Sequence, residues 1–205
     1  MPDNVLITGG GGDVARFVRS ALSDECQVVS LSKHQLDVRS KESVELAFSQ
    51  HEFDTVIHTA GTINPGHVTR IDPENWTRDI EVNTVGTFNL CHVALNANPQ
   101  CRLILLASTA AFNAYSDWTS YCISKYAQVN ISWALIEDGF DVVCLCPGAI
   151  DTKFRKSLNQ SNPNVMTVEE ASAPILSACL SSEITPGVYL YRKGTNLVPM
   201  PKQQY

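Results

Sequence analysis

The chain has 205 residues, of which 44% are hydrophobic and 18% are charged, and its formal net charge is -6 at pH 7. This length suits one substantial domain with a buried core, and the composition is that of a folded globular protein rather than a disordered one. The acidic balance without a Lys/Arg run excludes the basic surface that nucleic acids and anionic membranes require, so neither is expected as a partner. No apolar run is long enough to span a membrane, and the acidic start of the chain lacks the positive charge of a secretory signal. We therefore expect a cytoplasmic location.

The seven cysteines form no Cys-x-x-Cys pair and lie mostly within apolar segments. This pattern predicts reduced thiols in the core and no metal site. Cys146 stands apart because it precedes a Pro-Gly pair, and its role is left open.

A glycine-rich turn follows the first predicted strand. The apolar run 5–7 ends in Thr8-Gly9-Gly10-Gly11-Gly12-Asp13-Val14-Ala15, and apolar residues with helical spacing come next. A strand, a glycine turn and a helix form the arrangement in which backbone N–H groups bind a pyrophosphate. Two spacings of the motif are possible, one using Gly10, Gly12 and Ala15 and the other using Gly9, Gly12 and Ala15. A turn that is merely flexible is the alternative.

The next predicted strand, 27–32, ends at the point where the adenosine ribose is selected. An acidic residue there would bind the 2′-hydroxyl of NAD and repel a 2′-phosphate. The strand ends instead in Ser30, Ser32 and Lys33. We therefore expect NADP rather than NAD, the alternative being that Lys33 is only a solvated loop residue.

The remaining elements predict a Rossmann-like α/β fold, with a doubly wound parallel sheet between two helical layers. Strands are expected at 53–58, 103–107, 141–146 and 187–191, and helices at 40–50, 73–96, 120–137 and from about 167. Asp72 and Pro73 predict the start of one helix, and Thr167 with Glu170 has the spacing of a capping box. The polar segment 153–166 is expected to be a mobile cover for a substrate. Without a linker or repeat, we expect a single domain over 1–205.

Tyr121 and Lys125 are four residues apart in a predicted helix, so their side chains lie on one face. An ammonium beside a phenol lowers the pKa of the phenol, and moving it from about 10 to neutral pH requires about 4 kcal/mol. Ser108 follows the strand 103–107, at the edge where open α/β sheets bind ligands. Asn83 lies among apolar neighbours in the helix 73–96 and needs hydrogen-bond partners. His58 is interpreted as a packed residue at a strand end rather than a catalytic base.

Taken together, these residues resemble the short-chain dehydrogenase/reductase family, in its single-domain reductase branch, over nearly the whole chain. The matching segments are Thr8-Gly9-x-x-Gly12-x-x-Ala15 for the cofactor loop, Asp37-Val38 beside adenine, Thr59-Ala60-Gly61, the tetrad Asn83, Ser108, Tyr121 and Lys125, and Pro147-Gly148-x-x-x-Thr152 on the nicotinamide side. The sequence departs from the family pattern at Ala15 and Asp13, where glycine is common, and at His58, where asparagine is usual.

The resemblance implies hydride transfer between nicotinamide C4 and a carbonyl or secondary alcohol of a small molecule. Tyr121 would protonate the oxygen, Ser108 would hydrogen-bond it, Lys125 would lower the phenol pKa and hold the ribose, and Asn83 would order a water next to Lys125. The expected cofactor-binding residues are Thr8, Gly9, Gly10, Gly12, Asp13, Val14, Ser32, Lys33, Asp37, Val38, Thr59, Ala60, Gly61, Tyr121, Lys125, Pro147, Gly148, Ile150 and Thr152.

Two other functions remain open at this point, a nucleotide-sugar epimerase or dehydratase of the same superfamily and an NADP(H)-sensing protein without catalysis. The family commonly forms homo-oligomers, dimers or tetramers, through the helices expected here at 73–96 and 120–137. Trp133 and Ile136 lie either in that contact or against the sheet. Arg155 and Lys156 could meet an anionic substrate, whose identity the sequence does not give.

Overall fold

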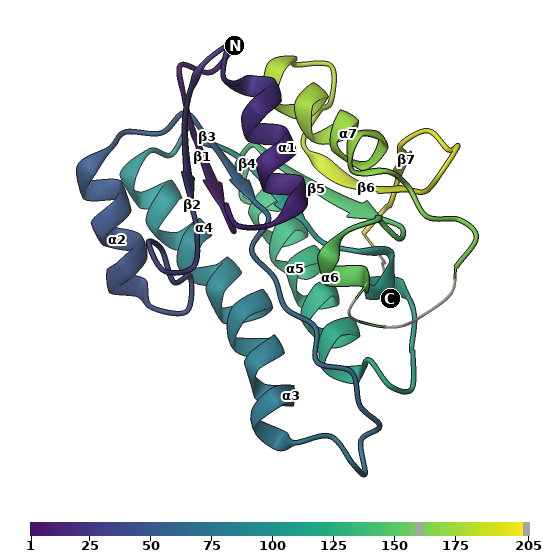
Figure 1. Ribbon diagram of the computed structural model, residues 1–205. Helices are drawn as coiled ribbons and strands as arrows, with labels where there is room; N and C mark the ends of the chain where they lie inside the picture. The colour runs from purple at the N-terminus through teal and green to yellow at the C-terminus, as the bar shows by residue number, and fades with distance from the viewer. Residues whose placement is uncertain (157, 159–161, 203–205) are drawn as a thin grey trace.

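The computed structural model describes residues 1–156, 158 and 162–202, and these residues surround one seven-stranded sheet (Figure 1). Its strands lie in the order β2-β1-β3-β4-β5-β6-β7, all parallel except the last pair. Their bounds are β1 Asn4–Thr8, β2 Gln27–Leu31, β3 Thr55–His58, β4 Arg102–Leu106, β5 Val142–Pro147, β6 Gly187–Tyr191 and β7 Val198–Pro199. The short antiparallel β7 lies in a tail for which the sequence predicted no strand.

Helices connect the strands. They are α1 Asp13–Leu22, α2 Lys41–Gln50, α3 Pro73–Ile80, the π turn η1 Glu81–Val85, α4 Gly86–Ala97, the 3-10 turn η2 Thr109–Phe112, α5 Thr119–Glu137, α6 Lys153–Lys156 and α7 Val168–Leu180. The predicted caps are confirmed. The Asp72 side chain accepts from the Glu74 N–H, and Thr167 and Glu170 form the capping box.

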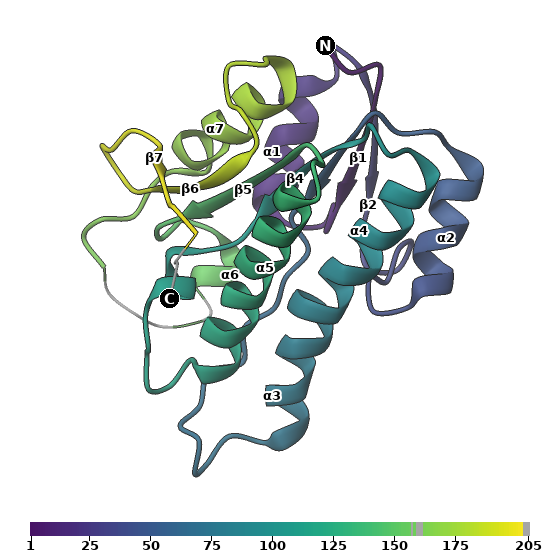
Figure 2. The same cartoon turned by 180° about the vertical axis from the view of Figure 1, so that it is seen from behind.

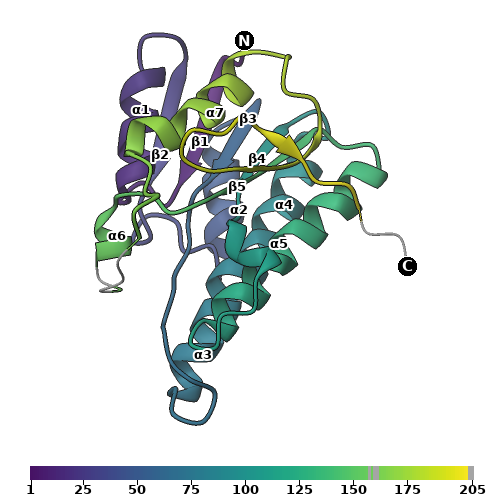
Figure 3. The ribbon, with the colours of Figure 1, turned by 90° about the vertical axis from the view of Figure 1, so that its right-hand side faces the viewer.

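The sheet is the middle of three layers, as predicted. Helices α1 and α7 pack together on one face, whereas α2, α4 and α5 cover the other (Figure 3). Side chains of a strand alternate between the faces. Val5 and Ile7 accordingly pack in the cluster formed with α1 and α7, while Leu6 between them packs in the cluster formed with α2 and α4.

The direction of winding reverses between β1 and β3. The chain leaves β1 through α1 to reach the edge strand β2, then passes back through α2 to β3 on the opposite side of β1. Ligands of open α/β sheets bind in the crevice at the carboxyl ends of the strands where such a reversal occurs. The glycine turn and Thr59 follow these two strand ends, so the topology places them at that crevice.

The long helix predicted for 73–96 is interrupted by the π turn around Asn83. The Gly86 N–H bonds the Glu81 carbonyl, five residues back, instead of a carbonyl four residues back. Single π turns inside helices frequently mark functional sites. The sequence predicted the helix and the buried amide but not this change of hydrogen bonding.

The side chains of Trp133 and Ile136 face the sheet. Trp133 is buried against Cys144 and Val188, and Ile136 packs against the cluster that includes Val142. The structure therefore favours the alternative in which they face the sheet.

All seven cysteines are unpaired, and all except Cys26 are buried, in agreement with the predicted core thiols. Among the described residues, no helix combines the length and the apolar character needed to cross a bilayer.

Candidate active site

A pocket of about 610 Å³ opens at the carboxyl ends of β1, β3, β4 and β5. It is lined by most of the residues that the sequence predicted for it, namely Gly9, Gly12, Asp13, Val14, Thr59, Ala60, Gly61, Ser108, Tyr121, Lys125, Pro147, Gly148, Ile150 and Thr152. The predicted residues that do not line it are Thr8, Gly10, Ser32, Lys33, Asp37, Val38 and Asn83. The glycine turn and the residues Ser108, Tyr121 and Lys125 thus share one pocket.

The glycine turn is shaped for an anion. Gly9 has a φ of 71°, and a Cβ there would lie 2.8 Å from the backbone of Ala60, so only glycine fits. A Cβ on Gly11 would meet nothing within 4 Å, which leaves open space in front of the turn. Helix α1 begins directly behind it, with Gly12 at the N-cap and no side-chain cap. A phosphate group fits this space, since the first N–H groups of a helix bind anions.

Asp13 connects the glycine turn to the other side of the pocket. Its Oδ2 accepts a hydrogen bond of 2.7 Å from the Lys153 backbone N–H at the start of α6. The sequence predicted Asp13 as a cofactor-binding residue and as a departure from a glycine position, but not this contact with Lys153. In the structure it fixes the beginning of the segment expected to cover the substrate. The predicted segment 153–166 begins as helix α6, and part of it, 157 and 159–161, lies outside the described residues.

Ser108 and Tyr121 form the centre of the pocket wall. Ser108 caps the η2 turn, where its Oγ accepts from the Ala110 N–H at 3.1 Å. Burial raises the pKa of Tyr121 to about 12, although the neighbouring Ser108 hydroxyl acts in the lowering direction. In the protein alone, desolvation therefore outweighs the other effects on the pKa of Tyr121. The lowering expected from Lys125 together with a cationic nicotinamide ring stays a prediction.

The Lys125 ammonium lies 5.7 Å from the centre of the Tyr121 ring. Its Nζ donates to the Leu106 carbonyl at 2.9 Å and to Gln128 Oε1 at 2.7 Å. The side chain is almost completely buried, and burial lowers the pKa of Lys125 to about 8. Lys125 can therefore change its protonation state close to neutral pH. The Leu106 carbonyl and the Gln128 side chain bind its ammonium from the interior, and the residue also lines the pocket.

Asn83 lies behind the pocket wall rather than in it. Its Oδ1 accepts from the Thr62 N–H at 2.8 Å, and its Nδ2 donates to the Thr62 carbonyl and to Ser124 Oγ, both at 2.9 Å. A Cβ on Gly61 would lie 3.3 Å from Asn83 Oδ1 and 3.5 Å from Lys125 Nζ. Asn83 therefore positions the segment after β3 directly over Lys125.

His58 is fully buried between two hydroxyls and does not line the pocket. Its Nδ1 lies 2.8 Å from Thr8 Oγ1 and its Nε2 lies 3.0 Å from Thr87 Oγ1. Burial, with a smaller contribution from the charge of Lys125, lowers the pKa of His58 to about 3. The structure thus supports the interpretation that His58 is a packed residue and not a base.

Asp79 is a buried carboxylate that the sequence reasoning missed. It accepts hydrogen bonds from Thr62 Oγ1 at 2.9 Å, from the Asn64 N–H at 3.0 Å and Nδ2 at 2.8 Å, and from Ser120 Oγ at 2.7 Å. These contacts join α3, the segment after β3 and the first turn of α5. Asp79 is the single buried residue of α3, a helix that is mostly exposed and polar, so no local pattern in the sequence identified it.

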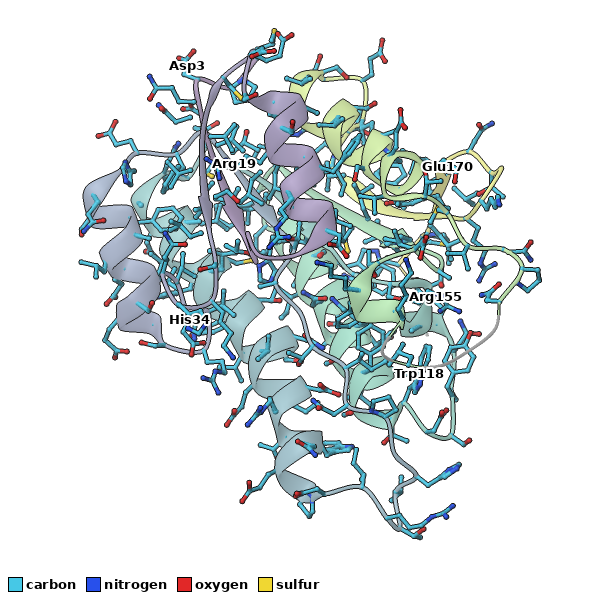
Figure 4. All side chains as sticks on the ribbon, in the orientation of Figure 1. Asp3, Arg19, His34, Trp118, Arg155 and Glu170 are labelled. Carbon is cyan, nitrogen blue, oxygen red and sulfur yellow. The ribbon has the colours of Figure 1, made fainter. Side chains whose placement is uncertain are left out.

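Aromatic rings border the pocket beside Tyr121. The Trp118 ring lies edge-on to Tyr115 and to Tyr121, with centroid distances of 5.2 and 6.1 Å, and Phe154 lies 6.4 Å from Tyr121 on the other side. Figure 4 labels Trp118 and Arg155 near α6, and both line the pocket. The lining residues not predicted as site residues are Gly11, Ala15, Ile63, Leu106, Ala107, Thr109, Ala110, Tyr115, Trp118, Ala149, Lys153, Phe154, Arg155, Leu158 and Asn162. Many lie in loops, where no periodic pattern identifies them.

Lys156, considered for an anionic substrate, and Cys146, whose role the sequence leaves open, both lie outside the pocket. Lys156 forms an ion pair of 3.0 Å with Asp151 and does not line the pocket, in contrast to Arg155. Cys146 is fully buried, and a hydrogen bond with Cys144 together with burial raises the pKa of its thiol well above the usual value. It is a core thiol below the site.

The residues expected near adenosine lie outside the pocket, around the end of β2. Lys33 is exposed, Ser32 Oγ donates to Gln35 Oε1 at 2.9 Å, and Arg39 binds the Asp37 carboxylate with a shortest distance of 2.6 Å. The hydrogen bonds from Arg39 lower the pKa of Asp37.

Ser30 and Val38 complete this region. Ser30 Oγ is buried beside Gly10 and has no hydrogen-bond partner among the described residues. Val38 packs in the core against Gly86.

Comparison with known proteins agrees with this geometry. The model of the family described as short chain dehydrogenase matches residues 4–163. A curated relative, the 3-oxoacyl-[acyl-carrier-protein] reductase FabG of Chlamydia trachomatis serovar D, is 25% identical over 174 residues, which are 78% of this chain and 69% of the relative.

Two solved structures share the fold. The ligand-free aldohexose dehydrogenase AldT of Thermoplasma acidophilum superposes with a TM-score of 0.82 at 20% identity, covering 98% of each chain. A short chain dehydrogenase of Burkholderia cenocepacia J2315 in complex with NADP gives a TM-score of 0.78 at 22% identity, covering 87% of this chain and 84% of the other.

Proposed function

Because the chain belongs to the short-chain dehydrogenase family, we propose that it is an NADP-dependent oxidoreductase that transfers a hydride between the nicotinamide and a carbonyl or secondary alcohol of a small molecule. One observation carries the proposal. Ser108, Tyr121 and Lys125 line the same pocket as the glycine turn. The open space at Gly11 and the N-terminus of α1 suit the pyrophosphate of a dinucleotide.

Tyr121 is the proton donor in this proposal. NADP, when bound, supplies or accepts the hydride. With a pKa of about 12, Tyr121 is protonated at neutral pH and can give its proton to the carbonyl oxygen during reduction. Ser108, whose hydroxyl neighbours the phenol in the same pocket, would bind the same oxygen. In the reverse direction the phenolate form of Tyr121 would accept the proton of the alcohol.

Lys125 holds the cofactor and supports Tyr121. An ammonium has three N–H donors, and the hydrogen bonds among the described residues occupy two of them. The third is available toward the pocket, where it would bind a ribose hydroxyl. The positive charge of Lys125 stabilises the phenolate that forms when Tyr121 has given up its proton.

The preference for NADP rests on the end of β2. Lys33 is exposed there and Asp37 is paired with Arg39, so no unpaired carboxylate among the described residues of 27–40 stands against a 2′-phosphate. The complex of the Burkholderia protein with NADP supports the same choice. Titration with NADPH and NADH tests it, and a smaller dissociation constant for NADH would contradict it.

The reaction is tested by supplying the purified chain with NADPH and a panel of aldehydes and ketones. Stoichiometric loss of NADPH absorbance with formation of the alcohol is expected. Product formed without net consumption of NADPH would favour an epimerase or dehydratase instead. Tight NADPH binding without turnover of any panel member would favour a sensing protein.

We further propose one domain over 1–205 and a homo-oligomer. Exposed apolar side chains lie on the outer faces of η1, α4 and α5, at Val85, Phe88, Ile123 and Tyr126. Figure 2 shows α4 and α5 side by side on this face of the molecule. Sedimentation of the purified chain tests the oligomer, and a monomer at micromolar concentration would contradict it.

A further inference from the structure

We propose that Gln128 is a positioning residue that holds the Lys125 ammonium from the protein interior and sets its proton affinity. The inference rests on the proposed function for its catalytic meaning, because Lys125 is assigned a role in that reaction. The contacts themselves exist independently of any substrate, so they can be tested separately.

A continuous chain of buried hydrogen bonds begins at Lys125. Its Nζ donates to Gln128 Oε1 at 2.7 Å, and Gln128 Nε2 donates to Thr87 Oγ1 at 2.7 Å. Thr87 Oγ1 donates to the Asn83 carbonyl, also at 2.7 Å. Gln128, Thr87 and Asn83 are fully buried.

The chemistry of the partners fixes the orientation of the Gln128 amide. An ammonium can only donate, so it must face the amide oxygen, and the amide nitrogen then faces Thr87. Thr87 has a single hydroxyl proton, and it donates this proton in a hydrogen bond to the Asn83 carbonyl, because a carbonyl can only accept. Thr87 Oγ1 can therefore only accept from Gln128.

The same argument determines the tautomer of His58. Since Thr87 can only accept, the proton of the neutral imidazole is on Nε2, and Nδ1 accepts from Thr8 Oγ1 at 2.8 Å. The chain of hydrogen bonds thus runs from Lys125 in α5, through α4 and β3, to the last residue of β1 before the glycine turn. It fixes Lys125 relative to the strand end that carries the cofactor loop.

On the interior side, the Lys125 ammonium contacts the amide of Gln128. An amide neither takes up nor releases a proton near neutral pH. The family resemblance implied that Asn83 orders a water beside Lys125. Here the Asn83 carbonyl accepts from Thr87, and the direct partners of Nζ are the Gln128 amide oxygen and the Leu106 carbonyl. Lys125 accordingly exchanges its proton on the pocket side, and Gln128 stabilises the charged form through its oxygen.

Several other groups act on the Lys125 ammonium. They are His58 from β3, Asp79 from α3, and Cys144 and Cys146 from β5, together with the ring of Tyr121 one turn earlier on α5. These groups are unchanged when residue 128 is substituted. A change in the proton affinity of Lys125 on substitution at 128 therefore reports the amide contact.

Two substitutions with opposite expected effects test the proposal. Gln128→Glu keeps the shape and places a carboxylate beside Nζ, which favours the ammonium. Gln128→Leu removes the acceptor, which disfavours it. Ser132→Ala is the matched control, since this buried hydroxyl one turn further along α5 donates to the Gln128 backbone carbonyl at 2.8 Å and leaves the side-chain contacts intact.

The measurement is the rate at which acetic anhydride modifies Lys125 as a function of pH, followed by mass spectrometry of the peptide that contains it. Lys125 lines the pocket, so a small reagent reaches it. We expect the midpoint to rise by about one pH unit in Gln128→Glu, to fall by about one in Gln128→Leu, and to stay at the wild-type value in Ser132→Ala.

Equal midpoints in all four proteins, or shifts of the same sign in both Gln128 variants, would overturn the proposal, because a purely structural role gives no opposite shifts. Circular dichroism confirms folding, and Gln128→Met replaces the leucine variant if the latter does not fold. The alkaline limb of the kcat profile is expected to move in the same directions. Opposite labelling shifts without turnover of any carbonyl would support the role of Gln128 and refute the proposed function.

Discussion

Asp13 and Lys153 are separated by most of the chain, yet the carboxylate of the first accepts a hydrogen bond of 2.7 Å from the backbone N–H of the second. The contact joins the first turn of α1 to the start of α6, and both residues line the pocket. It places a negative charge at the helix terminus where a pyrophosphate is proposed to bind.

Two substitutions separate the roles of the Asp13 carboxylate. Asp13→Asn keeps an acceptor for Lys153 and removes the charge, so we expect NADPH to bind about fivefold more tightly and the KM of the carbonyl to change little. This corresponds to about 1 kcal/mol for one partly exposed charge. Asp13→Ala also removes the connection to α6, and the KM of the carbonyl is expected to rise. Calorimetric titration with NADPH and steady-state kinetics measure both. Equal carbonyl KM values in the two variants would show that the connection to α6 does not matter.

Tyr121→Phe removes the proposed proton donor while keeping the ring contacts with Trp118 and Phe154. We expect kcat to fall by about 10² to 10⁴ and the dissociation constant of NADPH to change by less than about twofold. Tyr126→Phe is the control, because this tyrosine is on the same helix but is exposed and does not line the pocket. Wild-type turnover in Tyr121→Phe would exclude the phenol as the acid.

His58 makes the fold sensitive to acid. Its pKa is lowered to about 3 in the folded protein, whereas it is near 6.5 when the chain is unfolded. The unfolded chain therefore binds more protons between these values, and stability is lost as pH falls below 6.5, by about 2 kcal/mol at pH 5. His58→Gln retains hydrogen-bonding groups for Thr8 and Thr87 without this titration. Urea unfolding at pH 7 and pH 5 is expected to show a smaller loss in the variant, and an equal loss would disprove the assignment.

Trp118→Leu tests whether the aromatic border contacts the substrate. The substitution removes ring contacts with Tyr115 and Tyr121 on the side of the pocket away from the glycine turn. We expect a severalfold increase in the KM of the best carbonyl and an unchanged dissociation constant for NADPH. Trp76→Phe, which loses only the indole hydrogen bond to Thr119 outside the pocket, is the control. An unchanged KM in Trp118→Leu would place the substrate elsewhere.

The sequence predicted those parts of the site that depend on local pattern. The glycine turn between a strand and a helix, the spacing of Tyr121 and Lys125, and the position of Ser108 after a strand all follow from short segments, and the pocket contains them. The caps at Asp72 and Thr167 follow from local pattern as well.

Features that depend on distant segments could not be predicted. The raised pKa of Tyr121 results from burial, whereas the sequence suggested the charge of Lys125 and of a nicotinamide ring and gave no measure of desolvation. The bonds of Asp79 to Thr62 and Ser120, and of Gln128 to Thr87, each join elements that are adjacent only after folding. The sequence around Trp133 also did not indicate whether this side chain packs against the sheet or lies on the outer face of α5.

Because of the π turn at Glu81–Val85, the number of residues in this part of the helix determines which side chains face the interior. One residue of an α-helix corresponds to about 100° of rotation. Deleting a single residue between 81 and 85 would restore regular bonding, yet it would rotate Asn83 and Thr87 relative to each other, because Asn83 lies within the irregular turn and Thr87 follows it. One of the two side chains would then leave the interior. The chain would then have a more ideal helix and a Lys125 without its inner support. At this place a shortening by one residue is expected to be more harmful than any single side-chain replacement.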